Sequence, residues 1–537
     1  MPDFLSQTER RELMTRVRSQ GTGPERALWA ALRRRGVRPS TNSPRLPGKP
    51  DVVFHKARLA VFVDGEKWHG GQWRRRGLAT LDGAYAGAER RAYWVRKIQS
   101  NVSRDLRWTG ALLAEGWSVL RLWDRDVEKD AEACADLVLR ARDGGLRPDR
   151  MASAAALGTS ADFFAGIGLM RLGLEAGGWR TVWANDYDAT KRRLYYHNLG
   201  DERIGFTLES RSIHDVGPKS VPRVGLIAAC FPCTDLSLAG KQRGIEVGPQ
   251  SSAYLRFADM LAKMGGARPP FVILENVLGL ITAHEGRDFQ ICLRLLGEAG
   301  YRFDAVAVNA CRFVPQSRPR LFVVGVRREI DIPPTIDAGE AEVSTLRPAR
   351  LVEFIRANAD LPWAIRPMPE PPELTTFLPD ILEDLPFDDP RWWSTERVKK
   401  LRAQTSERHR RGLDALAAKR GVAWATGFRR MRKGTSTAEL RMDGIAGCLR
   451  TPKGGSAKQI LVRADADGWR ARLLTPRECA RLMGAPDFRF DAEGVRDDDA
   501  LFGFGDAVVV DVVNWVVRNA VNPLAAELIR GRLLRAP

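Results

Sequence analysis

The sequence predicts an α/β protein with two separate α/β units, the second built on a doubly wound parallel sheet. The chain has 537 residues, and at about 150 residues per domain a single small module is excluded. Hydrophobic residues make up 44% and charged residues 28% of the chain, which excludes a largely disordered or collagen-like protein. Apolar runs alternate with helical stretches on both sides of a segment rich in Gly, Ala and Ser, and this pattern predicts the two units.

The first predicted unit covers residues 1–143, and a linker follows at 144–159. The linker is rich in small residues and shows no apolar periodicity. Within the unit we expect helices over 9–18, 24–35 and 93–115, and strands over 51–54, 59–63 and 117–123. This combination is typical of a compact α/β unit.

After the linker, apolar strands and helices alternate as in a doubly wound sheet. The expected strands are 160–164, 181–184, 225–229, 271–275, 301–308 and 320–326. From about 327 the sequence becomes Pro-rich and strongly charged, and order returns near 471 with a helix over 475–483 and an apolar segment over 505–517. We therefore divide this part of the chain into 160–326, 327–470 and 471–537.

The charge balance favours a polyanionic partner. The chain has 85 Lys and Arg against 66 Asp and Glu, a formal net charge of +19, and nucleic acid is the first candidate for such a protein. The alternative is a GC-rich bacterial genome, which enriches Arg without any such partner. The charge alone does not choose between the two.

Neither the cysteines nor the apolar segments indicate a secreted or membrane protein. Seven cysteines are scattered along the chain, and Cys230 and Cys233 form an isolated CxxC, so neither a disulfide scaffold nor a paired zinc array is expected. The charged N-terminus lacks the apolar core of a signal peptide. The apolar stretch 500–518 is interrupted by two aspartates and an asparagine. We expect a bacterial cytoplasmic, nucleoid-associated protein with no membrane partner.

A glycine-containing turn follows the first strand of the second unit. Residues 162–168 read DFFAGIG, and Gly166 and Gly168 would let the backbone approach a ligand at a helix N-terminus. The alternative is a tight structural turn. Asp186 follows the second strand, where such folds use an acidic side chain to accept hydrogen bonds from ribose hydroxyls. Its alternative role is a helix N-cap.

Further polar groups lie near the ends of predicted strands. Cys233 closely follows strand 225–229, and the carboxyl end of a central strand is where open α/β sheets bind ligands. A thiolate there is a strong nucleophile, although a single cysteine is more often a small buried hydrophobe. Glu275 ends another strand, where an unpaired carboxylate is costly. Arg318 and Arg320 supply two cations to the same neighbourhood.

In chain order, seven segments resemble the sequential motifs of DNA cytosine-5 methyltransferases: DFFAGIG, NDYD, FPC, ENV, QSRPR, LTPRECARLMG and FGDAVVV. They cover about 160–326 and 471–518. The resemblance implies a Rossmann-like, S-adenosylmethionine-dependent methyltransferase domain over 160–326. Residues 327–470 would be its inserted target-recognition region, and 471–537 would complete the domain.

The resemblance also implies a mechanism in which these side chains converge on a cytosine. Cys233 would attack C6 covalently, Glu275 would hold and protonate N3, and Arg318, with Arg320 beside it, would steady the O2 side. The methyl group comes from S-adenosylmethionine, and the target base must be flipped out of the duplex. The implied cofactor residues are Phe164, Ala165, Gly166, Gly168, Asp186, Ile213, Pro232 and Asp506.

Two positions depart from the family pattern. Ser212 stands where the family often has an aspartate that contacts the adenine. Asp506 and Ala507 replace the usual Asn-Ser near the methionine carboxylate. Both changes concern the cofactor and neither touches the nucleophile, so we expect an active enzyme.

The region 327–470 is the part that varies most in this family and reads the DNA sequence. Here it is basic in patches and ends in a Gly-rich loop, a composition suited to phosphates and base edges. We interpret the charged run 391–411 as a solvated face. The candidate DNA contacts of the second unit are Gln316, Arg450, Thr451, Lys453, Gly454 and Gly455.

The first unit has its own cluster of acidic residues and a histidine. Asp51 and Asp64 lie on or beside two adjacent predicted strands, and Glu25, His69 and Asp105 belong to the same unit. Metal-dependent phosphodiester cleavage needs oxygen ligands for Mg²⁺ and a base that activates water. The alternative is a set of solvated charges at strand ends.

The surrounding segments resemble very-short-patch-repair (Vsr) endonucleases: MTRVRSQGTGPE, LPGKPDVVF, VFVDGEKWHG, KIQSNVSRD and GWSVLRLWD. The resemblance implies a restriction-endonuclease-like α/β fold of PD-(D/E)xK type and nicking beside a T:G mismatch, which arises when 5-methylcytosine deaminates. It implies that Asp51 is the principal Mg²⁺ ligand, Asp64 a second candidate, and His69 the general base. Glu25 and Asp105 would support them.

This unit also departs from its family. Asp64 stands where some members have histidine. Met14 and Trp68 remain as apolar wedges next to the mismatch, but Lys67 occupies one wedge position and unstacks bases poorly. Members with a structural zinc have Cys and His ligands around the WH segment. We expect no structural zinc here, because the corresponding positions are Glu66, Gly71, Trp73 and Arg125.

These observations predict a bifunctional enzyme that methylates cytosine in double-stranded DNA and nicks the mismatch that methylation engenders. Tethering the two activities raises their local concentration. The expected cofactors are S-adenosylmethionine and Mg²⁺, and DNA-repair proteins are further expected partners. Two alternatives stay open: a single-chain restriction-modification protein that cuts unmethylated or modified sites, and a nuclease-like half that only binds DNA.

Overall fold

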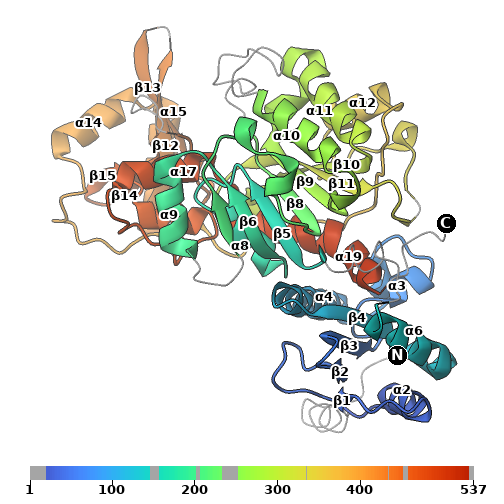
Figure 1. Ribbon diagram of the computed structural model, residues 1–537. Helices are drawn as coiled ribbons and strands as arrows, with labels where there is room; N and C mark the ends of the chain where they lie inside the picture. Colours follow the sequence, from blue (N-terminus) through green and yellow to red (C-terminus); the bar gives the residue numbers. More distant parts are fainter. Residues whose placement is uncertain are drawn as a thin grey trace.

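The structure of the protein is a computed structural model, drawn as a ribbon in Figure 1. It describes residues 20–144, 156–200, 206–232, 252–333, 335–432, 434–451 and 458–530. The predicted helix 9–18 lies outside these residues. Within them the chain forms a four-stranded, a seven-stranded and a second four-stranded sheet, and the predicted α/β class is confirmed.

The first unit has a sheet in the order β1-β2-β3-β4, in which β3 and β4 are parallel and the other neighbours antiparallel. Its strands are β1 (Ser40–Thr41), β2 (Val52–Phe54), β3 (Leu59–Asp64) and β4 (Ser118–Trp123). Its helices are α2 (Gly23–Arg34), α3 (Gln72–Arg75), α4 (Arg91–Ala114), α5 (Asp124–Lys129) and α6 (Ala131–Arg142). The sequence does not predict α6, because two of its four buried side chains are alanines.

The second unit has a seven-stranded sheet in the order β10-β11-β9-β8-β5-β6-β7, parallel except that β11 runs against both of its neighbours. The expected strands are present as β5 (Thr159–Phe163), β6 (Arg180–Asn185), β8 (Leu226–Ala229), β9 (Phe271–Val277), β10 (Tyr301–Asn309) and β11 (Pro319–Arg327). The added strand, β7 (Thr207–Glu209), has three residues and no apolar run.

Helices cover both faces of this sheet (Figure 1). They include α8 (Leu169–Ala176), α9 (Ala189–Leu199), α10 (Ser252–Lys263) and α11 (Arg287–Glu298). Adjacent residues of β9, such as Val272 and Ile273, belong to different apolar clusters, because successive side chains of a strand point to opposite faces. The polar ends of the parallel strands meet at one edge, which positions the site described below.

Residues 327–470 have more regular structure than their sequence indicates. Helix α12 (Ala349–Ala357) shares an apolar cluster with α11, and α13 (Leu378–Ile381) follows it. Beyond them an antiparallel sheet, in the order β13-β12-β14-β15, has an apolar cluster of its own with α14 (Thr395–Gln404) and α15 (Glu407–Arg420). Its strands are β12 (Ala423–Arg432), β13 (Thr435–Arg441), β14 (Ile460–Asp465) and β15 (Gly468–Leu473). The sequence conceals α14 and α15 because each buries only two side chains.

The C-terminal helices connect the two units. They are α16 (Pro476–Leu482), α17 (Asp497–Asp506), α18 (Val510–Val516) and α19 (Asn522–Ile529). Helix α18 packs on α8, and α19 packs on α4 of the first unit (Figure 1). By length and composition the stretch Asp497–Ile529 could cross a membrane, but 56% of its most apolar window is buried inside the protein.

The interface between the units is apolar and closely packed. Ile98, Val102 and Leu106 of α4 belong to the same apolar cluster as Leu524 of α19. Gly110 must be glycine, because a Cβ atom there would lie 2.4 Å from the carbonyl oxygen of Gly158. The shared cluster makes the first unit and the C-terminal helices one packed body.

Candidate active sites

A cavity of about 440 Å³ opens at the carboxyl ends of β5, β6, β8 and β9. All the predicted cofactor residues except Gly168 line it: Phe164, Ala165, Gly166, Asp186, Ile213, Pro232 and Asp506. Ser212 and Glu275 also line the cavity. The cavity therefore brings together residues that are far apart in the sequence, as the motif order predicts.

The turn after β5 presents its backbone to this cavity. The Gly166 N–H donates to Asp186 Oδ2 at 2.8 Å, and the Asp188 N–H donates to Asp186 Oδ1 at 2.9 Å. Burial is the main cause that raises the pKa of Asp186 above its ordinary value. Gly168 caps α8 with φ 93°, and a Cβ atom there would lie 2.4 Å from Leu199. Gly168 is therefore needed for the turn and its packing, and it does not line the cavity.

Lys191, which the sequence analysis did not identify, also lines the cavity. Its Nζ atom lies 2.7 Å from Asp506 Oδ2. The Lys191 ammonium group thus balances the charge of Asp506, which stands where the resemblance implies an uncharged Asn-Ser pair. Ser212 accepts a hydrogen bond from the His214 N–H at 3.4 Å, so it caps a short turn beside the cavity.

Glu275 lines the same cavity near the carboxyl end of β9. Its Oε1 atom lies 3.0 Å from Arg320 Nε. Burial raises the pKa of Glu275, against the lowering effect first of Arg320 and then of Arg318. Asn276 donates to the Phe231 carbonyl at 3.2 Å and so fixes the chain just before Pro232. Cys233 itself lies outside the described residues.

The structure corrects two expectations about the QSRPR segment. Arg318 is 1% exposed, and it donates to the carbonyls of Leu449 and Gly505, each at 2.8 Å. Its hydrogen bonds join its own turn to two other segments of the chain. Arg320, in contrast, lines the cavity. Gln316 is fully buried and donates to the Leu482 carbonyl at 2.8 Å, so it is not available to DNA in this arrangement.

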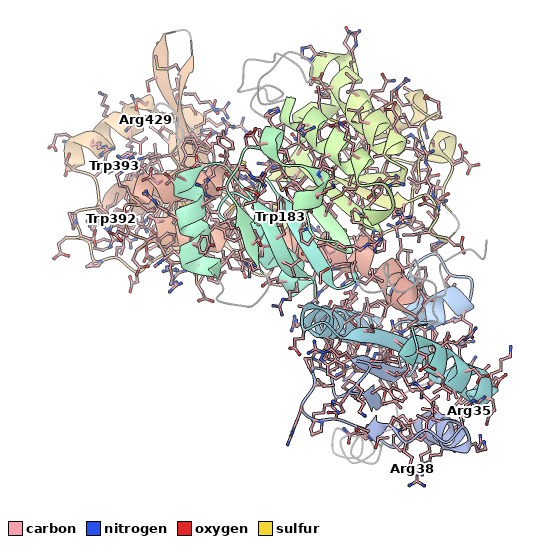
Figure 2. The ribbon with its side chains drawn as sticks, in the orientation of Figure 1. Arg35, Arg38, Trp183, Trp392, Trp393 and Arg429 are labelled. Atoms are coloured by element: carbon pink, nitrogen blue, oxygen red, sulfur yellow. The ribbon has the colours of Figure 1, made fainter. Side chains whose placement is uncertain are left out.

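Among the described residues, the remaining candidate DNA contacts of this half are Arg450 and Thr451. Arg450 is exposed with its guanidinium 5.4 Å from the Phe428 ring centroid, and Thr451 lines the cavity. The ring centroid of Trp393 lies 3.9 Å from the guanidinium group of Arg397 and 5.2 Å from that of Arg429. Figure 2 labels Trp393 and Arg429. The other predicted contacts fall outside the described residues: Met14, Lys453, Gly454 and Gly455.

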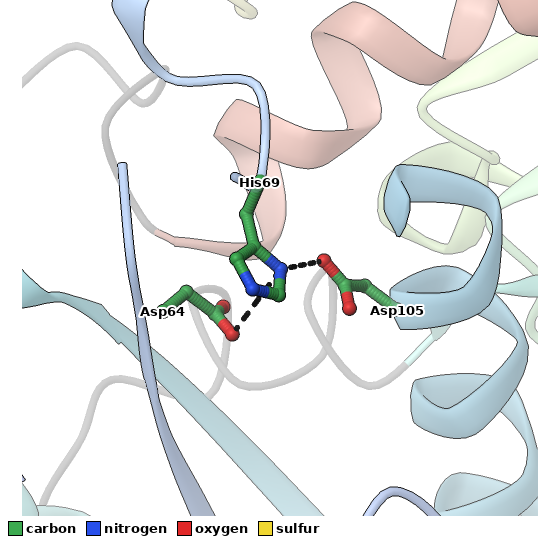
Figure 3. Close-up of side chains that lie close together, drawn as sticks. All are labelled: Asp64, His69 and Asp105. Atoms are coloured by element: carbon green, nitrogen blue, oxygen red, sulfur yellow. Dashed lines mark hydrogen bonds and ion pairs between the residues drawn. The ribbon is translucent and has the colours of Figure 1, made fainter. Parts of the chain in front are cut away.

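In the first unit, Asp64, His69 and Asp105 come together at the end of β3 (Figure 3). His69 Nδ1 lies 2.5 Å from Asp105 Oδ2 and 3.7 Å from Asp64 Oδ1. Among the described residues, they are a group of acidic and histidine side chains whose ligand atoms lie within 4.8 Å of one another. Asp105 thus orients the imidazole, as the resemblance implies for a supporting residue.

Two buried arginines balance these carboxylates. Arg121 of β4 donates to Asp64 from Nε at 2.7 Å and from Nη2 at 2.9 Å. Arg530, which directly follows α19, lies 2.8 Å from Asp64 Oδ2 and 3.2 Å from Asp105 Oδ2. Burial alone would raise the pKa of Asp64, but Arg121, then Arg530 and then His69, outweigh it, and the pKa lies below its ordinary value. The sequence analysis identified neither arginine.

The Asp51 carboxylate is hydrogen-bonded to the backbone of β3. Its Oδ2 atom accepts a hydrogen bond from the Val63 N–H at 2.7 Å. Burial first, and then the charges of Glu25 and Asp64, raise the pKa of Asp51 to about 7. Glu25 is itself buried and accepts hydrogen bonds from the Gly21 N–H at 2.7 Å and the Thr22 hydroxyl at 2.8 Å, so it also caps α2.

The predicted wedge Trp68 is half-buried beside the site. Its ring centroid lies 5.9 Å from that of Trp94, and Lys67 Nζ lies 5.3 Å from it. Nearby, Glu66 Oε2 lies 2.8 Å from Arg75 Nε and 3.6 Å from Arg125 Nε, so this position is part of an ion-pair cluster. The absence of a structural zinc stays a prediction.

Comparisons with known proteins identify a family for each of the two units. The model of the C-5 cytosine-specific DNA methylase family matches residues 158–522, and that of the DNA mismatch endonuclease Vsr matches residues 2–75. The Type II nicking enzyme V.NmeDIP of Neisseria meningitidis serogroup C is 43% identical over 139 residues, which are 26% of this chain and 89% of that protein.

Two further relatives show the same division. The Type II methyltransferase M.HhaI of Haemophilus parahaemolyticus is 26% identical over 360 residues, 67% of this chain and 92% of that protein. The Type II nicking enzyme V.XorIIP of Xanthomonas oryzae pv. oryzae is 42% identical over 123 residues, 23% of this chain and 85% of that protein. Both family resemblances are thereby confirmed: the chain belongs to the C-5 cytosine-specific DNA methylases and carries an N-terminal Vsr endonuclease domain.

Proposed function

We propose that the methyltransferase half acts on a flipped cytosine through a covalent bond to Cys233. The observation that supports this most strongly is the Glu275–Arg320 ion pair, which lines the same cavity as Phe231 and Pro232. Cys233 is the next residue in the sequence after Pro232. The Cys233 thiolate adds to C6 of the cytosine while Glu275 donates a proton to N3. Arg320, not Arg318, orients Glu275 and faces the O2 side.

The residues of the cavity fit S-adenosylmethionine, which supplies an electrophilic methyl group when bound. A Cβ atom at Gly166 would meet open space, so the backbone there is free to face a ligand. Asp186 provides a buried carboxylate for ribose hydroxyls, and Phe164 and Ile213 provide apolar surfaces for an adenine. Lys191 and Asp506 provide opposite charges for the amino-acid end.

We further propose that the first unit nicks DNA with Mg²⁺ held by Asp51. A carboxyl group with a pKa raised to about 7 beside two other carboxylates is a place where a cation would relieve repulsion, so the residues fit a metal ion. When bound, Mg²⁺ stabilises the charge that develops on the attacked phosphate. His69, oriented by Asp105, accepts the proton of the attacking water.

The proposed substrate of the nuclease is a T:G mismatch at the site that the other half methylates. Deamination of 5-methylcytosine produces this mismatch, and both active sites then serve the same DNA sequence in the bacterial cytoplasm. The target-recognition region, proposed as 327–470, reads that sequence through the β12–β15 sheet, which has an apolar cluster of its own. Arg429 of this sheet and Trp393, which packs against it, are the proposed contacts.

The covalent step can be tested with a duplex that carries 5-fluorocytosine at the target, because fluorine at C5 prevents release of the enzyme. We expect a denaturation-resistant protein–DNA complex that needs S-adenosylmethionine and that Cys233→Ala does not form. An equal yield from Cys233→Ala would contradict the assignment.

For the nuclease, nicking of a T:G duplex should require Mg²⁺ and stop in excess EDTA. EDTA-resistant nicking would contradict metal dependence.

A further inference from the structure

The chain places a side chain from the methyltransferase half inside the nuclease site. Arg530 directly follows α19, and α19 packs on α4, the helix that contains Asp105. The Arg530 side chain is 1% exposed, and its guanidinium lies 4.1 Å from the ring centroid of Trp123 in the nuclease sheet. In sequence it is more than 400 residues away from both carboxylates that it contacts.

Among the described residues, the buried arginines of the cluster equal the two carboxylates in number only when both halves are counted. Asp64 and Asp105 are two buried carboxylates, and the nuclease half places one buried cation, Arg121, against them. Arg530 is the second cation, and it bridges the two carboxylates from one nitrogen atom, Nη2. Two buried carboxylates with a single cation would be costly in a low-dielectric interior.

The Arg530 side chain is 1% exposed, and protein groups engage four of its five N–H donors, so it is not placed to bind a phosphate. Nε donates to Asp64 Oδ2 at 3.1 Å, Nη1 donates to the Ala526 carbonyl at 2.6 Å, and Nη2 lies between the two carboxylates. Its effect on the reaction must therefore pass through Asp105, which lies 2.5 Å from the imidazole of His69. The same carboxylates, with His69, form the group that could bind a metal ion.

We propose that Arg530 is a positioning residue of the nuclease: it takes the place of a second divalent cation between Asp64 and Asp105 and fixes the Asp105–His69 pair. This inference rests on the proposed nicking function. It means that the nuclease site is complete only when the methyltransferase half is folded against it. A chain that has lost its C-terminal helix cannot nick, even with every nuclease residue intact.

The test uses full-length Arg530→Ala, Arg530→Lys and, as a matched control, Arg366→Ala. Arg366 is another buried arginine of this interface, bonded to the Ala520 carbonyl at 2.8 Å and away from the acidic cluster. We expect Arg530→Ala to nick a T:G duplex about 100-fold more slowly, the loss typical of a displaced catalytic group. Its methylation rate should be unchanged, and Arg366→Ala should nick normally.

Two observations separate positioning from a general structural role. Arg530→Lys should recover much of the rate, and guanidinium ion at millimolar concentration should partly restore Arg530→Ala, whereas urea, which has the same shape and no charge, should not. Nicking by Arg530→Ala at the wild-type rate would overturn the inference. Faster nicking would also overturn it, because Arg530 would then block the site.

A binding measurement tests the inference even if the wild-type chain nicks no mismatch, a result that would refute the proposed nuclease function alone. Electron paramagnetic resonance counts the Mn²⁺ ions bound to each protein without DNA. Arg530→Ala should bind one Mn²⁺ more than the wild type, at the vacated place, and the double variant Arg530→Ala/Asp105→Asn should lose it. An unchanged count in Arg530→Ala would contradict the proposed cation-like role.

Discussion

The two active sites differ in how their buried charges are balanced. In the nuclease, Asp64 and Asp105 are paired with buried arginines, and the cluster is closed by protein groups alone. In the methyltransferase, Glu275 has an arginine partner but faces a cavity of about 440 Å³. Asp186 lines the same cavity and accepts hydrogen bonds from the backbone N–H groups of Gly166 and Asp188. As proposed above, a distant part of the chain completes the nuclease site, and the cofactor and the target base complete the other.

The pKa values divide the acids by their partners and not by domain, since Asp51 of the nuclease groups with the acids of the methyltransferase. Arginines hold the pKa of Asp64 below its ordinary value, whereas burial raises the pKa of Asp51, Asp186 and Glu275. An acid with a lowered pKa is part of a fixed ion pair, and an acid with a raised pKa marks a place for a cation, a hydroxyl or a proton. The variants below test this difference.

The largest effect is expected from Cys233→Ala, which removes the proposed nucleophile. Methyl transfer should fall by at least about 10³-fold, as measured by transfer of a radiolabelled methyl group, while T:G nicking stays unchanged. The matched control is Cys230→Ala, because burial and then the charge of Glu275 raise the pKa of the Cys230 thiol well above its ordinary value. Strong loss in the control and none in Cys233→Ala would reverse the assignment.

Asp51→Asn should lower nicking by at least about 100-fold, because it removes the proposed metal ligand. The same change should stabilise the metal-free protein. The folded chain holds a proton on Asp51 that the unfolded chain loses between about pH 4 and 7, so stability falls as pH rises through this window. At pH 8 the buried, ionised Asp51 carboxylate lowers the free energy of unfolding by at most about 4 kcal/mol, and Asp51→Asn removes this destabilisation.

Thermal unfolding in EDTA measures this cost. At pH 8 the Tm of Asp51→Asn should exceed that of the wild type, and the difference should shrink towards pH 4. Added Mg²⁺ should raise the Tm of the wild type only. A lower Tm for Asp51→Asn at pH 8 would show that the carboxylate is stabilised by protein groups, as Asp64 is.

Arg320→Met and Arg318→Met should fail in different ways. Arg320→Met should lower methyl transfer by about 100-fold with little change in Tm, since Arg320 faces the cavity. Without Arg320 the pKa of Glu275 should rise further, so the alkaline fall of the rate should move to higher pH. Arg318→Met should lower the Tm instead, because it leaves buried carbonyls without donors. Equal Tm losses in the two variants would contradict the distinction.

The smallest effect is expected from Lys191→Met. Without Lys191 the charge of Asp506 is unopposed near the proposed carboxylate end of the cofactor. Binding of S-adenosylmethionine, measured by calorimetry, should weaken by about 3–10-fold, or about 1 kcal/mol. Asp506→Asn is the matched control and should bind at least as tightly as the wild type. Unchanged binding by Lys191→Met would place the carboxylate elsewhere.

The sequence predicts the parts of this molecule that depend on local pattern. The apolar runs predict six strands of the central sheet, and the residues that end them, such as Glu275 and Asp186, do line one cavity. Arg318 and Arg320 are two residues apart, so strand alternation assigns them to the same face. The sequence therefore could not show that Arg318 donates to internal carbonyls while Arg320 lines the cavity. Arg530 could not be predicted, because its contact with Asp64 depends on how two units pack across 466 residues of sequence separation.

We propose that one chain both methylates a cytosine and nicks the mismatch derived from it. The direct test maps the methylated cytosine and then compares two duplexes that differ only there, one with C:G and one with T:G, with Mg²⁺ present. We predict a nick in the T:G duplex and none in the unmethylated C:G duplex. Cutting of the C:G duplex, with the T:G duplex left intact, would contradict the claim and indicate a restriction enzyme.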